Sequence, residues 1–305
     1  MNALRHIRVL SDGRPGHENQ SVGLALALAR RTGASYEVVK LNPAAGVWAR
    51  MRAATAEGNE GQKPQLLIAA GHRTHLPLWW AARKFGARSV VIMKPSLPLA
   101  FFDLALVPKH DVAEGAVDSA GRVLTRGALN RVPEALPEKE PVGLVLIGGP
   151  SKHHGWDGTA LAPCIARVMA AQPELSWTVA DSRRTPEGFL AGLDLPPEVK
   201  RMPHQATTPA WLPGELARAQ SVWVTEDSVS MVHEAVTAGA ATGVLPAPRL
   251  RASRVLRAVD GLVTAGYASS WADWERVGAL RVGEKLQESG RCAEMIIERW
   301  FGSET

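Results

Sequence analysis

Residues 222–239 read VWVTEDSVSMVHEAVTAG, a short apolar run followed by polar residues and then by apolar residues at helical spacing. The apolar run predicts a strand, and Asp227 or Ser228 is a natural N-cap for the helix that follows. Gly239 is the residue expected just past the C-terminus of that helix. A strand that leads through a polar loop into a helix is the building unit of a parallel α/β sheet.

The predicted helix in this stretch carries groups that suit a nucleotide. Thr225, Ser228 and Ser230 would meet phosphates at the positive end of the helix. Glu234 is two turns further along, on the side of Asp227, and could accept hydrogen bonds from ribose hydroxyls. Taken alone, a capped helix with one exposed glutamate explains the stretch equally well. The predicted nucleotide-contacting residues of this segment are Thr225, Asp227, Ser228, Ser230, Met231 and Glu234.

The alternation of strands and helices extends from this stretch in both directions. The C-terminal half has predicted strands at 142–147, 175–180, 199–202, 221–225 and 242–245, and helices at 159–171, 187–193 and 228–238. The N-terminal half has predicted strands at 7–11, 36–40, 66–70, 89–93 and 104–107, and helices at 18–31, 43–55 and 75–85. The pattern predicts an α/β protein with two doubly wound, Rossmann-like domains facing a cleft, and ligands in such sheets bind beyond the carboxyl ends of the strands.

A proline-rich segment separates the two halves. Residues 132–141 contain three prolines and four charged residues, a composition typical of linkers. We therefore expect one domain at 1–135 and a second at 136–290, followed by a last helical segment at 291–305.

The composition restricts the class of protein. The 305 residues carry a net charge of +5, which suits an anionic ligand or an acidic membrane surface, but no basic block or nucleic-acid motif is present. No apolar run could span a bilayer and no signal peptide is visible, so we expect a cytoplasmic protein, with peripheral association at the inner membrane as an option. Cys164 and Cys292 are interpreted as free thiols. Tryptophan is frequent; core packing explains most of it, and a membrane- or acceptor-facing surface would explain the rest.

The loop after the first strand is the strongest candidate for catalysis. Residues 11–20 read SDGRPGHENQ and lead into a helix N-terminus. Asp12 or His17 could act as a general base, whereas a rigid turn in which Asp12 binds local backbone is the alternative. The loop is not G-x-G-x-x-G, so it does not predict a dinucleotide site. Its other acceptor-side candidates are Gly13, Arg14, Gly16, Asn19 and Gln20.

The segment Gly71–His75 follows another strand of the first half. Gly71, His72, Arg73 and Thr74 could line an acceptor pocket, and Thr74 could cap the next helix. A metal site is not expected, because no carboxylate or cysteine accompanies the histidines at ligand spacing. Structural and functional explanations both remain open for this segment.

Two loops of the second half carry phosphate-binding groups. Gly148 and Gly149 would let a ligand approach the backbone, with Ser151 and Lys152 to meet phosphate, although the segment is not a P-loop. The other loop offers two arginines and two hydroxyls at a helix start, which suits a diphosphate. Its residues are Ser182, Arg183, Arg184 and Thr185.

Four motifs together resemble the bacterial and plant family named for the plant mitochondrial fission factor "elongated mitochondria" (ELM). They are SDGRPGH at 11–17 with Asn19 and Gln20, IGGPSK at 147–152, SRRTP at 182–186 and VTEDSVSM at 224–231. The resemblance covers nearly the whole chain. It implies a GT-B architecture, a last helix that crosses back to the first domain, and no bound metal. It also implies an acceptor-side N-terminal domain and a nucleotide-sugar site in the C-terminal domain. That site would be lined by Ser182, Arg183, Arg184, Thr225, Ser228, Ser230 and Glu234.

The resemblance supports two hypotheses of function. Bacterial members are usually described as candidate glycosyltransferases. This implies transfer of a sugar from a nucleotide-diphosphate sugar, such as a UDP-sugar, to an envelope or lipid-linked glycan acceptor. No tightly bound cofactor is expected. The plant protein recruits a dynamin-related protein to the mitochondrial surface. The alternative is therefore a non-catalytic adaptor of GT-B shape that recruits a protein partner at a membrane surface. An epimerase that holds NAD is disfavoured by the missing dinucleotide fingerprint.

Overall fold

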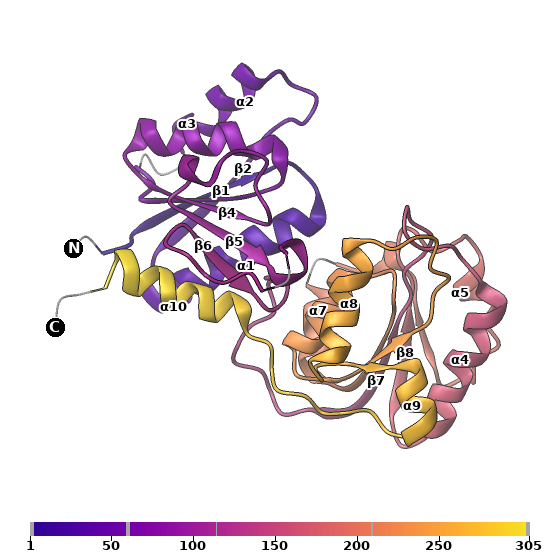
Figure 1. The fold of residues 1–305 in the computed structure, drawn as a ribbon. Coiled ribbons are helices and arrows are strands. Elements are labelled where there is room, and N and C mark those ends of the chain that lie inside the picture. The colour runs from indigo at the N-terminus through magenta and orange to yellow at the C-terminus, as the bar shows by residue number, and fades with distance from the viewer. Residues whose placement is uncertain (1–2, 59–61, 114, 209, 303–305) are drawn as a thin grey trace. The chain divides into compact units, whose positions relative to one another are not determined.

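The computed structural model describes residues 3–58, 62–113, 115–208 and 210–302, and the chain divides into two compact units (Figure 1). Unit 1 consists of Met1–Arg131 and Gln287–Thr305, and unit 2 of Val132–Leu286. Both divisions fall a few residues before the limits expected at 135 and 290. Each unit contains a six-stranded sheet whose paired strands are all parallel.

The sheet of unit 1 has the strand order β2-β1-β3-β4-β5-β6. Its strands are β1 (His6–Ser11), β2 (Ser35–Lys40), β3 (Leu66–Ala70), β4 (Arg88–Ile92), β5 (Leu104–Pro108) and β6 (Arg122–Thr125). The first five confirm predicted strands. The sequence did not predict β6, because four residues with two apolar side chains are too short for a periodic signal.

The helices of unit 1 are α1 (Pro15–Thr32), α2 (Val47–Ala54), α3 (His75–Phe85) and α10 (Glu288–Trp300). Helix α1 begins before the predicted residue 18, with Pro15 at its start, where the missing N–H costs no intrahelical bond. It ends at Gly33, whose φ of 72° is the left-handed conformation that favours glycine. His17 therefore lies in the first turn of a helix, and not in the preceding loop as predicted.

The last helix, α10, completes the core of unit 1. Cys292 and Ile296 are fully buried in one cluster with Leu24 and Leu28 of α1. Ser289 exchanges hydrogen bonds with the backbone of residue 130, donating to its oxygen at 2.9 Å and accepting from its nitrogen at 3.1 Å. The chain thus leaves unit 1 once and returns to it at the end. Both cysteines are free, which confirms that prediction.

The sheet of unit 2 has the strand order β12-β11-β10-β7-β8-β9. Its strands are β7 (Glu140–Leu146), β8 (Ser176–Ala180), β9 (Lys200–Met202), β10 (Ala219–Thr225), β11 (Ala241–Leu245) and β12 (Ser269–Ser270). The chain starts at β7, runs outward through β8 to β9, and then crosses back to β10 on the other side of β7. The loops at the carboxyl ends of β7 and β10 therefore meet where the winding reverses, the usual ligand position in such sheets.

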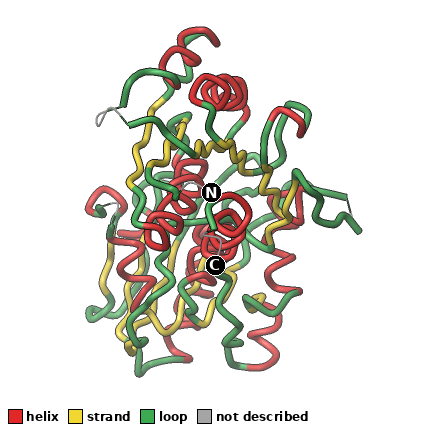
Figure 2. Tube along the Cα trace, turned by 90° about the vertical axis from the view of Figure 1, so that its left-hand side faces the viewer, coloured by secondary structure: helices red, strands yellow, loops and turns green. Residues whose placement is uncertain are grey.

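Helices cover both faces of this sheet; Figure 1 shows α7 and α8 on one side of it and α4 and α5 on the other. Figure 2 distinguishes helices, strands and loops of the whole chain by colour. They are α4 (Gly158–Ala171), α5 (Phe189–Gly192), α6 (Trp211–Arg218), α7 (Val229–Thr237), α8 (Arg254–Thr264) and α9 (Trp271–Val277). One core contains Val232 of α7 and Val259 of α8, and the other contains Trp223 and Trp274. The sequence did not predict α6, because Pro213 and Gly214 inside it oppose helix formation.

Across the described residues, no helix is both long enough and apolar enough to cross a membrane.

Candidate functional site

Three polar loops of unit 2 join into one cluster at the carboxyl ends of β7, β8 and β10. The N–H of Gly148 donates to Oγ1 of Thr225 at 2.7 Å, and the N–H of Gly149 donates to Oδ2 of Asp227 at 2.9 Å. The guanidinium of Arg184 lies 2.7 Å from Oδ2 of Asp227 and donates to the carbonyl oxygen of Gly149, also at 2.7 Å. The structure thus brings together the segments that the sequence singled out separately.

The two glycines serve a different purpose from the predicted one. A Cβ atom on Gly148 would lie 2.1 Å from Oδ2 of Asp227, and one on Gly149 would lie 2.0 Å from the carbonyl oxygen of Arg184. Such distances are far below van der Waals contact. The groups that approach the backbone of these glycines therefore belong to the protein itself. The expectation that the glycines make room for a ligand is wrong.

Several hydroxyls predicted to meet phosphate are instead bonded inside the cluster. Oγ1 of Thr185 accepts from the N–H of Ser182 at 2.9 Å and donates to the carbonyl oxygen of Ile147 at 3.1 Å. Oγ of Ser151 accepts from the N–H groups of His153 and His154, both at 3.1 Å. Together with the buried Thr225, these residues shape the loops.

Other predicted residues remain at the surface beside α7. Lys152, Arg183 and Ser230 are exposed, while Met231 and Glu234 are half-buried. Ser228 is the N-cap residue of α7, but its side chain makes no capping hydrogen bond. The Asp227 carboxylate, the other predicted cap, binds Gly149 and Arg184 instead. The first-turn N–H groups of α7 therefore have no N-cap side chain as a partner. The positive end of this helix can accept an anion. Gly239 follows the helix with a φ of 70°, which confirms its predicted place.

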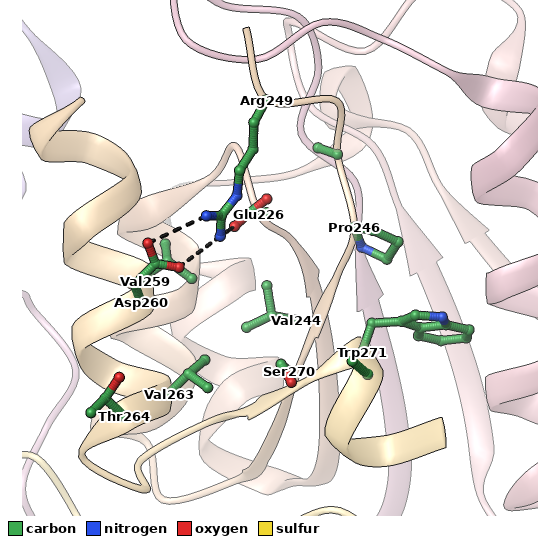
Figure 3. A pocket seen from close by; sticks show the side chains of 12 residues that line it. Glu226, Val244, Pro246, Arg249, Val259, Asp260, Val263, Thr264, Ser270 and Trp271 are labelled. Atoms are coloured by element: carbon green, nitrogen blue, oxygen red, sulfur yellow. Dashed lines mark hydrogen bonds and ion pairs between the residues drawn. The ribbon is translucent and has the colours of Figure 1, made fainter. Parts of the chain in front are cut away.

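A buried carboxylate that the sequence did not single out lies beside this cluster. Glu226 is 6% exposed and pairs with Arg249 of the loop after β11, which also contacts Asp260 of α8 at 2.6 Å (Figure 3). The two carboxylates raise the pKa of the Arg249 guanidinium. The three side chains border a pocket of about 560 Å³ whose wall includes Val244 and Val263. The signal that could have found Glu226 is its position directly after a buried strand.

The loop after β11 is itself bound to the loop after β7. The N–H of Gly155 donates to the carbonyl oxygen of Pro248 at 2.8 Å, and the N–H of Leu250 to that of His153 at 2.9 Å. Beneath this contact the side chain of His154 is fully buried, with Nε2 3.9 Å from Oε2 of Glu226. Burial lowers the pKa of His154 and the nearby carboxylate of Glu226 opposes that shift. Four strand-end loops of unit 2 are therefore interlocked.

In unit 1, Asp12 and His17 form a hydrogen-bonded pair at the carboxyl end of β1. Nδ1 of His17 lies 2.9 Å from Oδ2 of Asp12, whose Oδ1 accepts from the N–H of Arg14 at 3.1 Å. The Asp12 side chain is 2% exposed and that of His17 is 19% exposed. No residue that the structure describes hydrogen-bonds Nε2 of His17. Asp12 thus binds local backbone and also orients the imidazole, the arrangement that prepares a histidine to act as a base.

Gly71 allows the loop after β3 to pack against this pair. Its φ of 93° is the left-handed region, and a Cβ atom there would lie 2.4 Å from Nδ1 of His17 and 2.7 Å from Oδ2 of Asp12. His72 and Arg73 are exposed, but Thr74 is completely buried. The hydroxyl of Thr74 donates to the carbonyl oxygen of Gly71 at 2.7 Å and does not cap α3, so the predicted capping role is wrong.

The remaining candidates around the pair are partly committed to structure. Oδ1 of Asn19 accepts from the N–H of Arg131 at 3.3 Å, and Nε2 of Gln20 donates to the carbonyl oxygen of Gly16, also at 3.3 Å. Gly13, with a φ of 77°, and Arg14 are exposed. His75 bonds to Ser96 at 2.8 Å, and burial lowers its pKa to about 4, with His72 and His17 adding to the shift. It is therefore neutral at neutral pH.

Two parallel six-stranded sheets, each covered by helices on both faces and each ending in polar loops, define this protein as a member of the GT-B structural class. Solved structures of that class match over nearly the whole chain. They include a UDP-N-acetylglucosamine 2-epimerase (TM-score 0.58, 13% identity, 100% of this chain and 98% of that chain). They also include the calicheamicin glycosyltransferase CalG4 (TM-score 0.53, 16% identity, 98% and 100%).

The chain belongs to the mitochondrial fission ELM1 family, whose model matches residues 15–300. A relative in Rickettsia prowazekii (strain Madrid E), the uncharacterized protein RP120, is 22% identical in an alignment of length 286. The match covers 76% of this chain and 79% of the relative. The fold is shared by glycosyltransferases and epimerases, so it does not by itself distinguish these two activities.

Proposed function

We propose that the protein binds a nucleotide-diphosphate sugar on unit 2 and transfers the sugar to an envelope or lipid-linked glycan acceptor. The observation that carries the proposal is the interlocked set of strand-end loops beside the uncapped N-terminus of α7. Arg183 and Lys152 are exposed on those loops and supply positive charge for a diphosphate. Glu234, in the second turn of α7, would accept hydrogen bonds from the ribose. The names of the structural neighbours make UDP the first nucleotide to test.

The chemistry that we propose requires a base for the acceptor hydroxyl. His17, oriented by Asp12, would accept that proton at Nε2 while the acceptor oxygen bonds to the anomeric carbon of the sugar. The bond from that carbon to the diphosphate breaks, and the nucleoside diphosphate leaves with the electron pair. The positive end of α7 and Arg183 would stabilise the departing charge, which is how such a reaction proceeds without a bound metal.

Isothermal titration of the intact protein with UDP, GDP, ADP and CMP and their sugars tests the proposal. We expect one nucleoside diphosphate to bind with a Kd below about 1 mM, a free energy of about −4 kcal/mol. Heat signals absent for every nucleotide at that concentration would contradict the proposal and favour the non-catalytic adaptor. Analysis of the products would separate transfer or hydrolysis, which release the diphosphate, from epimerisation, which does not.

Glu234→Ala is expected to weaken nucleotide binding about tenfold or more, because a hydrogen bond to a charged acceptor contributes about 1.5–3 kcal/mol. The melting temperature should stay near that of the wild type, since Glu234 is half-buried on the surface of α7. Glu234→Gln, which keeps one acceptor oxygen, should lose less. Unchanged affinity in Glu234→Ala would contradict the placement of the ribose.

Arg183→Ala is expected to weaken nucleoside diphosphates more than the matching nucleosides, because its exposed guanidinium would contact only the phosphates. Arg257→Ala is the matched control, since this arginine is also exposed in unit 2 but lies on α8. Titration of each variant with UDP and with uridine gives the comparison. An equal loss for the two ligands would place Arg183 away from the diphosphate.

A further inference from the structure

Two neighbouring helices of unit 1 expose large apolar side chains. Trp48 of α2 is 77% exposed, and Leu76 and Trp80 of α3 are 39% and 41% exposed. By contrast, Trp223 and Trp274 are buried in the core of unit 2. An exposed tryptophan beside other exposed apolar residues is typical of an interaction surface.

The two helices form one continuous region. The guanidinium of Arg50 in α2 donates to the carbonyl oxygen of Arg73, just before α3, at 3.1 Å. Nζ of Lys84, near the end of α3, donates to the carbonyl oxygen of Thr55, just after α2, at 3.4 Å. These two contacts show that the helices run in the same direction, and Figure 1 shows α2 next to α3. We call this region the α2–α3 surface and define it by Trp48, Arg52, Arg73, Leu76, Trp80, Arg83 and Lys84.

The charge of this region has one sign. Helices α2 and α3 read VWARMRAA and HLPLWWAARKF and contain four arginine or lysine residues but no carboxylate. Within the part of the chain that the structure describes, no carboxylate forms an ion pair with any of the basic residues of the α2–α3 surface. Arg83 lies over the ring of Trp79, 4.5 Å from its centroid. The basic groups are thus available to anions outside the protein.

We propose that the α2–α3 surface binds the surface of a bilayer that contains anionic phospholipid. Tryptophan favours the interface between headgroups and acyl chains, where its apolar ring and its N–H are both accommodated. Arginine and lysine at the same level bind lipid phosphates and extend their aliphatic stems along the apolar side chains. The exposed indoles match the apolar boundary of the acyl chains. The basic groups, which form no ion pair among the described residues, match the phosphates of the headgroups. The proposal goes beyond the nucleotide site, because it concerns different residues of unit 1 and needs no nucleotide.

Flotation with vesicles tests the proposal on the intact protein without nucleotide. We expect binding to vesicles of phosphatidylcholine with about one third phosphatidylglycerol, little binding to phosphatidylcholine alone, and a decrease as salt screens the charges. The double variant Trp48→Ser/Trp80→Ser and the double variant Arg52→Glu/Lys84→Glu should each reduce the partition coefficient at least about tenfold.

Two control variants match these changes. Val117→Ser removes another exposed apolar side chain of unit 1, which is 72% exposed. Arg30→Glu reverses an exposed charge in the last turn of α1, as Arg52→Glu does in α2. Both should bind vesicles like the wild type, and the melting curve of each variant should show a folded protein. The proposal is overturned if the wild type does not bind anionic vesicles, if it binds neutral vesicles equally well, or if folded double variants bind unchanged.

Discussion

Asp227→Ala is expected to destabilise unit 2 by about 2–4 kcal/mol, which corresponds to a decrease in melting temperature of about 5–10 °C for a unit of this size. The Asp227 carboxylate is 3% exposed and accepts from the N–H of Gly149 at 2.9 Å while it pairs with Arg184. Alanine would leave that N–H and that guanidinium without their partner. The loop after β10 would then be held less firmly against the loops after β7 and β8, so nucleotide affinity should decrease as well.

Thermal unfolding of Asp227→Ala, Asp227→Asn and Asp194→Ala measures this effect. Asp227→Asn keeps an acceptor for Gly149 but loses the charge, so an intermediate loss is expected. Asp194 is exposed, and its removal should change the stability by less than about 0.5 kcal/mol. A melting curve of Asp227→Ala that coincides with that of the wild type would show that the loop cluster does not depend on this carboxylate.

His17→Ala is expected to reduce the rate of sugar transfer by about a hundredfold to ten-thousandfold, the usual contribution of a general base. Its affinity for the nucleotide should be unchanged, because His17 belongs to unit 1 and the proposed nucleotide site to unit 2. Asp12→Asn should also slow the reaction, since it alters the hydrogen bond that orients the imidazole at 2.9 Å.

The measurement is the release of nucleoside diphosphate from the nucleotide-sugar that the titrations identify. Arg30→Ala is the control, because this arginine is exposed in the last turn of α1, at the other end of the helix from His17, and has no assigned part in binding or proton transfer. If His17→Ala retained the wild-type rate, the base would be another group. If it lost nucleotide affinity instead, the separation of roles between the two units would be wrong.

The sequence predicted the strands well, because buried parallel strands are short apolar runs bounded by turn residues. It placed the start of α1 too late, at residue 18, because Pro15 and Gly16 belong to the polar stretch predicted as a loop, although a proline is favoured in the first turn of a helix. It did not predict α6, in which burial of Leu216 outweighs the unfavourable Pro213 and Gly214. Local preference failed where tertiary packing decides the conformation.

The candidate site was predicted by position but not in its detail. The rule that ligands bind beyond strand ends selected loops that the structure brings together in unit 2. It could not show that Thr225 and Asp227 bind the backbone of the loop after β7, because those contacts join residues more than seventy positions apart. The pairing of Glu226 with Arg249 also depends on tertiary structure, because it needs the loops after β10 and β11 to meet at the edge of the sheet.

The central claim is that unit 2 holds a nucleoside diphosphate at the N-terminus of α7. A crystal of the intact protein soaked with the tightest nucleoside diphosphate from the titrations, at a saturating concentration, tests it most directly. We predict density for the diphosphate at the first turn of α7, with Arg183 at the phosphates and the ribose hydroxyls within hydrogen-bonding distance of Glu234. Density for the nucleotide elsewhere on the chain, with an empty α7 N-terminus, would contradict the claim.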